Sequence, residues 1–273
     1  MISKESIRKI YQSTYPAFIM FLISSITMNL VGKVAVKIYL ESIETISSHP
    51  VSENITTQFF SLYGLHINMI AHVICLLYLL PMLNKTLKEA VKYHNYSSSI
   101  YLVAITIVGF LGLNLMLTAI LNISGMGRSI SFQNLATMVA GGSVPVRFLA
   151  VVIIGPLVEE ICFRGIVLNR LLAWSKPSAA VIIQSISFGA VHGNLVQFLF
   201  SICLGVALGS MFVKFRKLWV CIVGHVVFNL LGFVFSILIS MQADISVLLM
   251  LILGVIFSSL GSFALLKLPG AVM

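Results

Sequence analysis

The chain has 273 residues, of which 59% are hydrophobic and 9% are charged, and its mean hydropathy is +1.07. So few polar groups cannot coat a soluble globule of this size, which excludes a soluble enzyme or binding domain. A formal net charge of +9 would suggest nucleic-acid binding in a soluble protein, but here the basic residues lie between apolar blocks, where they are typical of topology signals and headgroup contacts. We therefore predict an integral membrane protein that contacts the lipid bilayer and binds no nucleic acid.

The apolar blocks can be counted, because a membrane-spanning helix needs about 20 apolar residues. About eight blocks are present, which predicts an all-α, polytopic membrane helical bundle. The first block follows Lys4, Arg8 and Lys9 but is too long for a signal peptide and lacks a cleavage pattern, so we expect a retained helix. Short connections predict a single membrane domain over residues 1–273. The blocks cover residues 14–40, 60–83, 99–123, 147–173, 178–197, 198–215, 218–241 and 245–268.

The basic residues divide unevenly between the two sides of the predicted bundle. With the amino terminus in the cytoplasm, the external loops carry only Arg128 and Arg147, while Lys33 and Lys37 lie near the outer end of the first block. The positive-inside rule then predicts both termini in the cytoplasm, and the composition favours a bacterial plasma membrane. The internal segments carry Lys4, Arg8, Lys9, Lys85, Lys88, Lys92, Arg170, Lys176, Lys214, Arg216, Lys217 and Lys267.

Ionisable side chains interrupt the fourth apolar block at Glu159, Glu160 and Arg164. On insertion scales, each charge near the middle of a membrane helix costs roughly 2.5–3.5 kcal/mol. Glu160 and Arg164 are four residues apart and share a helix face, whereas Glu159 points about 100° away. This spacing predicts that one glutamate forms a structural ion pair while the other remains free for general-base chemistry.

Two further polar clusters follow in the second half of the chain. The fifth block contains Phe188-Gly-Ala-Val-His192, and the seventh contains His225-Val-Val-Phe-Asn229, whose polar residues share a helix face. Counting about 1.5 Å per residue from the cytoplasmic ends places His192 about 21 Å deep, Glu159 and Asn229 about 16 Å deep, and His225 about 10 Å deep. We expect the three clusters to meet despite this uneven register.

At these clusters the chain resembles the CAAX-protease and bacteriocin-processing (CPBP) family, intramembrane glutamate peptidases that include the type II CAAX prenyl endopeptidases. The family patterns EExxxR, FxxxH and HxxxN/D match Glu159 to Arg164, Phe188 to His192 and His225 to Asn229, in the family's order. The resemblance covers about residues 145–235, which we expect to be the catalytic, motif-bearing core. The first 140 residues are not covered by it.

The resemblance implies a hydrolase that cleaves a peptide bond in a membrane-associated peptide or protein, as in CAAX-like or leader-peptide processing, without a metal or another cofactor. By this resemblance, Glu159 and His192 activate the attacking water, and His225 and Asn229 donate hydrogen bonds to the developing oxyanion. The remaining polar and aromatic residues of the three patterns have supporting or structural roles: Glu160, Arg164 and Phe188.

Three other functions compete with this interpretation. Two histidines and a glutamate could ligate zinc in a metallopeptidase, although HExxH is absent. A bacteriocin-immunity or scaffold protein could use the same cavity without catalysis, and a transporter would also place polar groups at the midplane. His66 and His72 have no acidic neighbour in their block, and we expect them to pack or to form hydrogen bonds between helices.

Overall fold

The computed structural model describes residues 3–46, 55–90, 100–240 and 246–268, and every element in these ranges is helical. The predicted all-α membrane bundle is thereby confirmed. The long helices are α1 (Lys4–Ile46), α2 (Ile55–Ala90), α3 (Ile100–Ser124), α8 (Pro177–Ala190), α9 (Leu195–Phe215), α10 (Leu218–Ser240) and α11 (Val247–Lys267). The shorter elements are η1 (Met126–Arg128), α4 (Ile130–Ala140), α5 (Val144–Arg147), η2 (Phe148–Ile154), α6 (Gly155–Glu160), η3 (Ile161–Leu168) and α7 (Asn169–Leu172).

Six helices in the described ranges are long and apolar enough to cross a membrane: α1, α2, α3, α9, α10 and α11. The other two predicted blocks correspond to the continuous helical run from α5 to α7 and to α8, which is apolar but short. The expected count of eight spans is therefore approximate. The break between the fifth and sixth blocks occurs at residues 191–194, earlier than expected, because a turn ends α8 there. Lys92, used in the topology prediction, lies outside the described residues.

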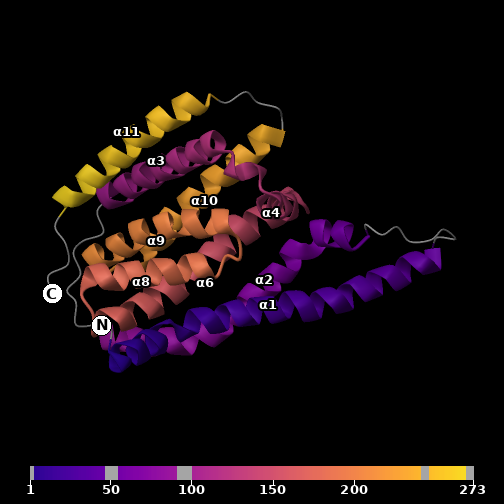
Figure 1. The fold of residues 1–273 in the computed structure, drawn as a ribbon, viewed down its shortest axis with the longest axis horizontal. Helices are drawn as coiled ribbons and strands as arrows, with labels where there is room; N and C mark the ends of the chain where they lie inside the picture. Colours follow the sequence, from indigo (N-terminus) through magenta and orange to yellow (C-terminus); the bar gives the residue numbers. More distant parts are fainter. Residues whose placement is uncertain (1–2, 47–54, 91–99, 241–245, 269–273) are drawn as a thin grey trace.

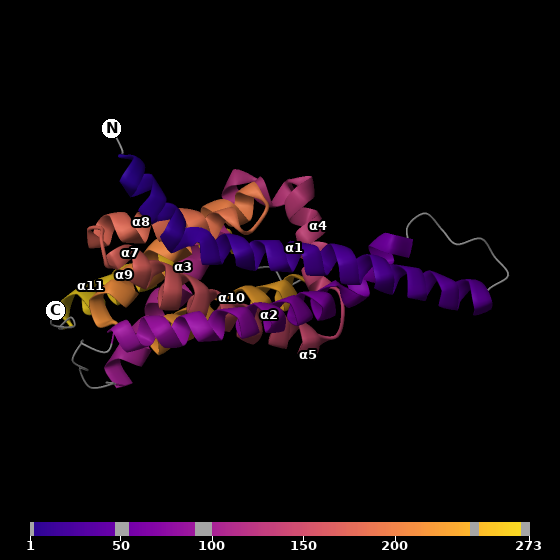
Figure 2. The same ribbon diagram turned by 90° about the horizontal axis from the view of Figure 1, so that it is seen from below.

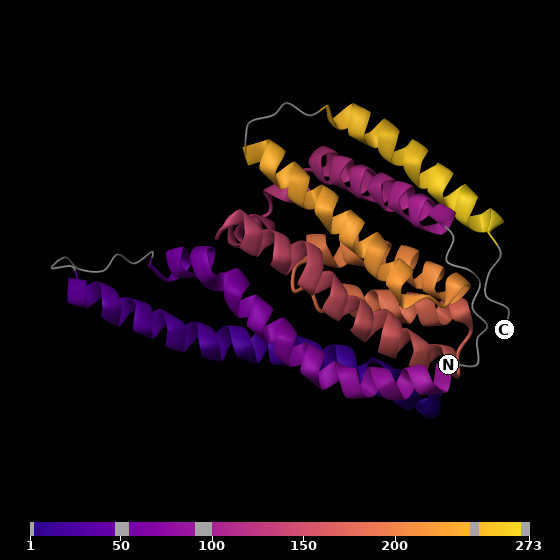
Figure 3. The ribbon, with the colours of Figure 1, turned by 180° about the vertical axis from the view of Figure 1, so that it is seen from behind.

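The helices form layers that run in roughly one direction. In Figure 1, α3 and α11 lie side by side at one edge of the molecule, and α1 and α2 lie at the opposite edge. The elements α5 to α10 fill the space between these two pairs, as the view from behind also shows (Figure 3). The run from α5 to α7 contacts α1, α2, α8, α9 and α10, so the segment with the predicted acidic pair is central.

Helices α1 and α2 extend beyond the rest of the bundle (Figures 1 and 2). Helix α1 contains 43 residues and is therefore about 65 Å long, about twice the thickness of the hydrocarbon core. Near this far end the two helices are joined by aromatic contacts, with ring centroids 5.5 Å apart for Tyr39 and Phe59 and 6.1 Å apart for Tyr39 and Tyr63. The helix pair thus remains packed where it leaves the bundle.

Close packing joins α3 to α11 through glycines. A Cβ atom on Gly254 would lie 2.5 Å from the backbone nitrogen of Met116, and one on Gly261 would lie 2.5 Å from the Cα atom of Gly109. No side chain fits at either position without moving the helices apart. Small residues therefore set the distance between these two helices, as is typical of membrane helix packing.

Candidate active site

The two adjacent glutamates lie on α6, a short α-helical piece between two π-helical segments, η2 and η3. Pro156 occupies the first turn of α6, where a missing N–H group is tolerated. All eight residues of η3 are buried. The side-chain amide of Asn169, the first residue of α7, donates to the carbonyl oxygens of Gly165 and Arg164 in η3, at 3.0 and 3.4 Å. π-helical turns occur often at functional sites, and here they set the direction of both carboxylates.

Glu160 lies at the centre of a fully buried polar group. Its Oε1 atom accepts from the Arg164 guanidinium at 2.6 Å and lies 2.8 Å from Nδ1 of His225, while both Glu160 and Arg164 are 0% exposed. The guanidinium also donates to the carbonyl oxygen of Gly205 on α9, at 3.4 Å. The ion pair predicted from the four-residue spacing is thus present, and it ties α6, η3, α9 and α10 together.

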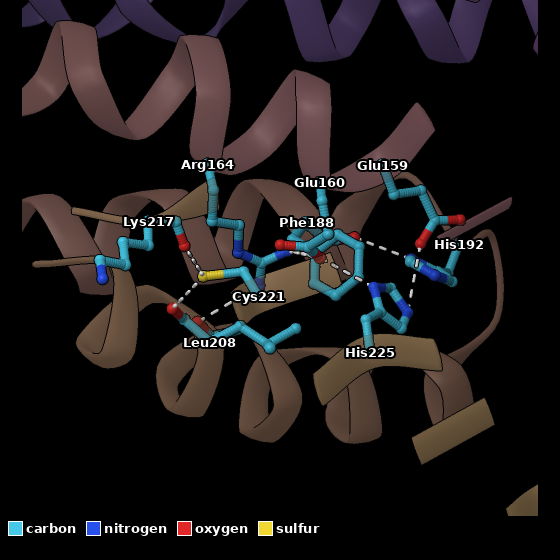
Figure 4. Close-up of polar contacts among 10 residues, drawn as sticks. Glu159, Glu160, Arg164, Phe188, His192, Leu208, Lys217, Cys221 and His225 are labelled. Atoms are coloured by element: carbon cyan, nitrogen blue, oxygen red, sulfur yellow. Dashed lines mark hydrogen bonds and ion pairs between the residues drawn. The ribbon is translucent and has the colours of Figure 1, made fainter. Parts of the chain in front are cut away.

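Glu159 points in another direction, as Figure 4 shows. Its side chain is 20% exposed, and Oε2 lies 3.6 Å from Nε2 of His225. This separation is longer than a hydrogen bond. Because a carboxylate only accepts hydrogen bonds, Nδ1 of His225 donates to the ionised Glu160, and the second ring nitrogen faces Glu159. The sequence-based expectation of one enclosed and one accessible glutamate matches these positions.

His192 lies in the turn directly after α8. Its Nδ1 atom is 2.7 Å from the carbonyl oxygen of Phe188, so Nδ1 carries a proton and donates it, and Nε2 is left as an acceptor in the neutral ring. Gly193 follows with a φ of +75°, which favours glycine because other residues clash in that region. Asn194 then caps the N-terminus of α9, and its side-chain oxygen accepts from the backbone nitrogen of Gln197.

The carboxamide of Asn229 joins α10 to η2. Its nitrogen donates to the carbonyl oxygen of Val151 at 2.9 Å. That bond uses one of the two amide protons, so the other remains available to a bound group. Val151 precedes the acidic pair on the same helical run, and the bond therefore fixes the position of α10 relative to the glutamates.

The Phe188 ring lies among the charged and imidazole groups (Figure 4). The Arg164 guanidinium is 4.8 Å from its centroid, and the rings of His192 and His225 lie edge-on at 4.9 and 5.8 Å. A cation over an aromatic face is attracted by the ring quadrupole. Phe188 thus supports three of the predicted site residues at once and is itself fully buried.

A cavity of about 600 Å³ brings the predicted residues together. Its lining includes five of them: Glu159, Phe188, His192, His225 and Asn229. The depth estimates from uniform helices were therefore wrong for His225, which had been placed nearer the cytoplasmic end than Glu159. Helices that begin at different levels, and π segments that advance less per residue than an α-helix, remove the difference.

Sequence reasoning missed several residues of the cavity wall. His72 was expected to pack or to form hydrogen bonds; its Nδ1 lies 2.8 Å from the carbonyl oxygen of Asn68, but the residue also lines the cavity, which was not expected. No motif marks this histidine, so only the tertiary contact reveals it. By contrast, His66 is exposed on the same helix and contacts Tyr63. The other polar lining residues outside the motifs are Ser24, Asn68, Gln197 and Ser201.

The arrangement supplies the groups needed for acid–base chemistry inside the helical bundle. An accessible carboxylate and imidazole nitrogens can accept and return a proton, and imidazole and amide N–H groups can stabilise a developing negative charge. Among the described residues, no three His, Cys, Asp or Glu side chains are grouped so that they could hold a metal ion. The fold and the site together define a polytopic membrane protein with a polar cavity inside its helical bundle.

Comparison with known proteins gives two partial matches. Residues 141–231 match a family model described as type II CAAX prenyl endopeptidase Rce1-like, which confirms the resemblance to the CPBP family drawn from the three motifs. The matched segment contains every predicted site residue. A similar protein from Bacillus subtilis (strain 168), named "Putative membrane peptidase YdiL", is 31% identical over 87 residues. That alignment covers 32% of this chain and 36% of the relative, so the chain matches only about a third of the relative's length. No solved structure matches the chain.

Proposed function

We propose that this protein is an intramembrane endopeptidase of the glutamate type, which hydrolyses a peptide bond in a membrane-associated peptide or protein. One observation carries the proposal: Glu159, His192, His225 and Asn229 line the same cavity, although they come from three separate parts of the chain. The Rce1-like match over residues 141–231 and the name of the Bacillus relative support the class of reaction.

In the proposed reaction, Glu159 and His192 bind a water molecule and accept its proton as its oxygen bonds to the peptide carbonyl carbon. The carbonyl electron pair moves onto its oxygen, and the oxyanion accepts hydrogen bonds from Nε2 of His225 and the free amide proton of Asn229. His225 must carry both ring protons for this role, since Nδ1 donates to Glu160. The accepted proton then passes to the amide nitrogen as the carbon–nitrogen bond breaks, which yields a carboxylic acid and an amine.

Glu160 and Arg164 have a different role in this proposal. Both are fully buried and bonded to each other, so they cannot contact a substrate without leaving the pair. We infer that they form a brace that holds His225 in place through Glu160. Removing one member of a buried pair leaves an uncompensated charge, which ties the stability of the site to the intact pair.

The distribution of basic residues also supports a location and a topology for the protein. We infer a bacterial plasma membrane with both termini in the cytoplasm. Contacts between helix ends support a shared side for the basic residues: Arg170 donates to the carbonyl oxygen of Gln12 at 3.3 Å, and Lys214 donates to that of Leu265. The first residues of α1 and the last of α11 also lie at the same end of the molecule (Figure 1). These contacts support a topology in which most of the positive charges lie on one side of the bundle, as the positive-inside rule predicts.

The test is cleavage of a membrane peptide library by the purified protein, read by mass spectrometry, with and without a zinc chelator. Glu159→Gln should reduce turnover at least about 10²-fold, because it removes the general base, while expression and folding stay near wild type. Glu5→Gln is the matched control, since it removes a carboxylate that is 65% exposed at the start of α1.

The zinc metallopeptidase and the immunity or scaffold function each predict their own result in this experiment. Cleavage that survives chelation and is lost in Glu159→Gln supports the proposal. Cleavage that is lost on chelation and restored by zinc would replace it with a zinc metallopeptidase. Full activity of the variant would remove Glu159 from the role of base. If the wild-type protein cleaves neither prenylated nor unprenylated peptides, the result favours the bacteriocin-immunity or scaffold function. A screen for binding partners would then be the next experiment.

A further inference from the structure

One wall of the cavity comes from a part of the chain that the family match does not cover. Residues of α1 and α2 line this wall, whereas the matched segment begins at residue 141. Most of them are apolar, and the polar exceptions are Ser24, Asn68 and His72. Of these three, only His72 has a side chain that can carry a proton or accept one. The wall formed by α1 and α2 therefore contains one ionisable group.

The orientation of His72 is fixed by its own helix. Its Nδ1 atom lies 2.8 Å from the carbonyl oxygen of Asn68, one turn earlier. A carbonyl oxygen can only accept, so Nδ1 carries a proton and donates it. In the neutral ring Nε2 is then an acceptor, and no hydrogen-bond partner for it is found among the described residues. The structure thus presents a directed, unused acceptor at the cavity.

The acceptor faces the helix that carries the acidic pair. A Cβ atom built on Gly155 would lie 4.0 Å from Nε2 of His72, and Gly155 also lines the cavity. Gly155 and Glu159 are four residues apart on α6, so they lie on the same helix face, one turn from each other. Because Gly155 has no side chain, the imidazole comes close to the backbone of α6 beside the proposed base.

We propose that His72 is a positioning residue for the peptide substrate: Nε2 accepts a hydrogen bond from a backbone N–H group near the scissile bond. This inference rests on the proposed endopeptidase function. An extended peptide that enters a membrane cavity brings N–H groups that lose their water partners, and each unpaired group is costly there. A backbone contact recognises the peptide main chain itself, independent of its side chains or of a lipid modification.

Two variants of His72 distinguish the roles of its two ring nitrogens. His72→Asn places an amide near the position of Nδ1, so it keeps the bond to Asn68 and removes the distal acceptor. His72→Gln places an amide oxygen near the position of Nε2 and keeps the acceptor. If Nε2 holds the substrate, His72→Asn should raise KM about tenfold, as expected for one lost buried hydrogen bond. His72→Gln should restore KM to within about threefold of wild type.

The measurement combines kinetics with binding. KM and kcat are measured for a peptide from the cleavage library, and the Kd of the same labelled peptide is measured in the Glu159→Gln background, where it is not turned over. His66→Asn is the matched control, because His66 is exposed on the same helix and does not line the cavity. Thermal unfolding of every variant shows whether His72 instead has a packing role, which would lower the melting temperature and leave KM unchanged.

The outcomes distinguish the two proposals. A rise in KM and Kd for His72→Asn, reversed in His72→Gln, supports the inference. Wild-type KM and Kd in both variants overturn it and leave the endopeptidase proposal intact. If the wild-type protein does not cleave but the peptide binds and His72→Asn weakens that binding, the peptide contact stands and the catalytic proposal fails. If the peptide is neither cleaved nor bound, both proposals are wrong.

Discussion

Replacing Arg164 by alanine tests the proposed brace most directly. The guanidinium is completely buried and makes three kinds of contact: an ion pair with Glu160 at 2.6 Å, a hydrogen bond to the carbonyl of Gly205 at 3.4 Å, and a cation–π contact with Phe188 at 4.8 Å. Arg164→Ala removes all three and leaves the Glu160 carboxylate enclosed without its counter-charge. We therefore expect a loss of stability before any effect on chemistry is considered.

The magnitude follows from these contacts. Removing one partner of a buried ion pair costs about 3–5 kcal/mol, and losing a desolvated cation–π contact costs about 2 kcal/mol. The two costs cannot simply be added, because the same guanidinium makes both contacts. A loss of about 4 kcal/mol, at roughly 2–4 °C per kcal/mol for a chain of this size, lowers the melting temperature on the order of 10 °C. Activity should fall as well, because Glu160 also holds Nδ1 of His225 at 2.8 Å.

Thermal unfolding in detergent measures this loss. Two further variants serve as controls for this measurement. Lys9→Ala breaks an exposed pair with Glu5, whose contribution is at most about 1 kcal/mol, so its melting temperature should stay within about 3 °C of wild type. The double variant Glu160→Gln with Arg164→Met removes both buried charges and keeps an acceptor for His225, so it should recover at least half of the lost stability.

The opposite result would refute the brace. If Arg164→Ala melts within about 2 °C of wild type, the buried pair contributes little to stability. If that stable variant is also inactive, the guanidinium must act in the catalytic or substrate-binding site.

Two further predictions concern α10 and α11. Asn229→Ala should lower kcat about 10²–10³-fold with a smaller change in KM, as for loss of an oxyanion donor. Steady-state kinetics measure both constants. A decrease in kcat of less than about threefold would exclude this role for Asn229. Gly254→Val should lower the melting temperature by several degrees, because its Cβ would lie 2.5 Å from the backbone nitrogen of Met116. Ser262→Val, at an exposed position on α11, is the control. If Gly254→Val and Ser262→Val melt at the same temperature, the packing argument is wrong.

Composition and block length were sufficient to predict a helical membrane protein, because hydropathy reports burial in lipid directly. They were less able to predict where helices end. The turn at residues 191–194 lies within an apolar stretch, and only Gly193, with its positive φ, marks it in hindsight. The run from α5 to α7 reads as one regular helix in the sequence, since periodicity does not distinguish π turns from α turns over so few residues.

In the candidate site, too, some contacts could be predicted from the sequence and others could not. The pairing of Glu160 with Arg164 could be predicted, because it depends on one helix and a four-residue spacing. The approach of His225 to both glutamates could not, since it depends on how α10 packs against α6. His72 could not be found either, because a single histidine in an apolar helix carries no pattern. Local spacing predicts partners within a helix, whereas contacts between helices require the fold.

The two π-helical segments on either side of α6 make the direction of the acidic pair adjustable by insertion or deletion. Each π turn holds more residues than the α turn that could replace it. Losing one residue from η2 could restore a regular α-helix and rotate α6 by about 100° relative to the preceding segment. Glu159 would then leave the cavity although every motif residue remained in the chain. In this architecture, the length of the flanking segments decides whether an intact motif has a working geometry.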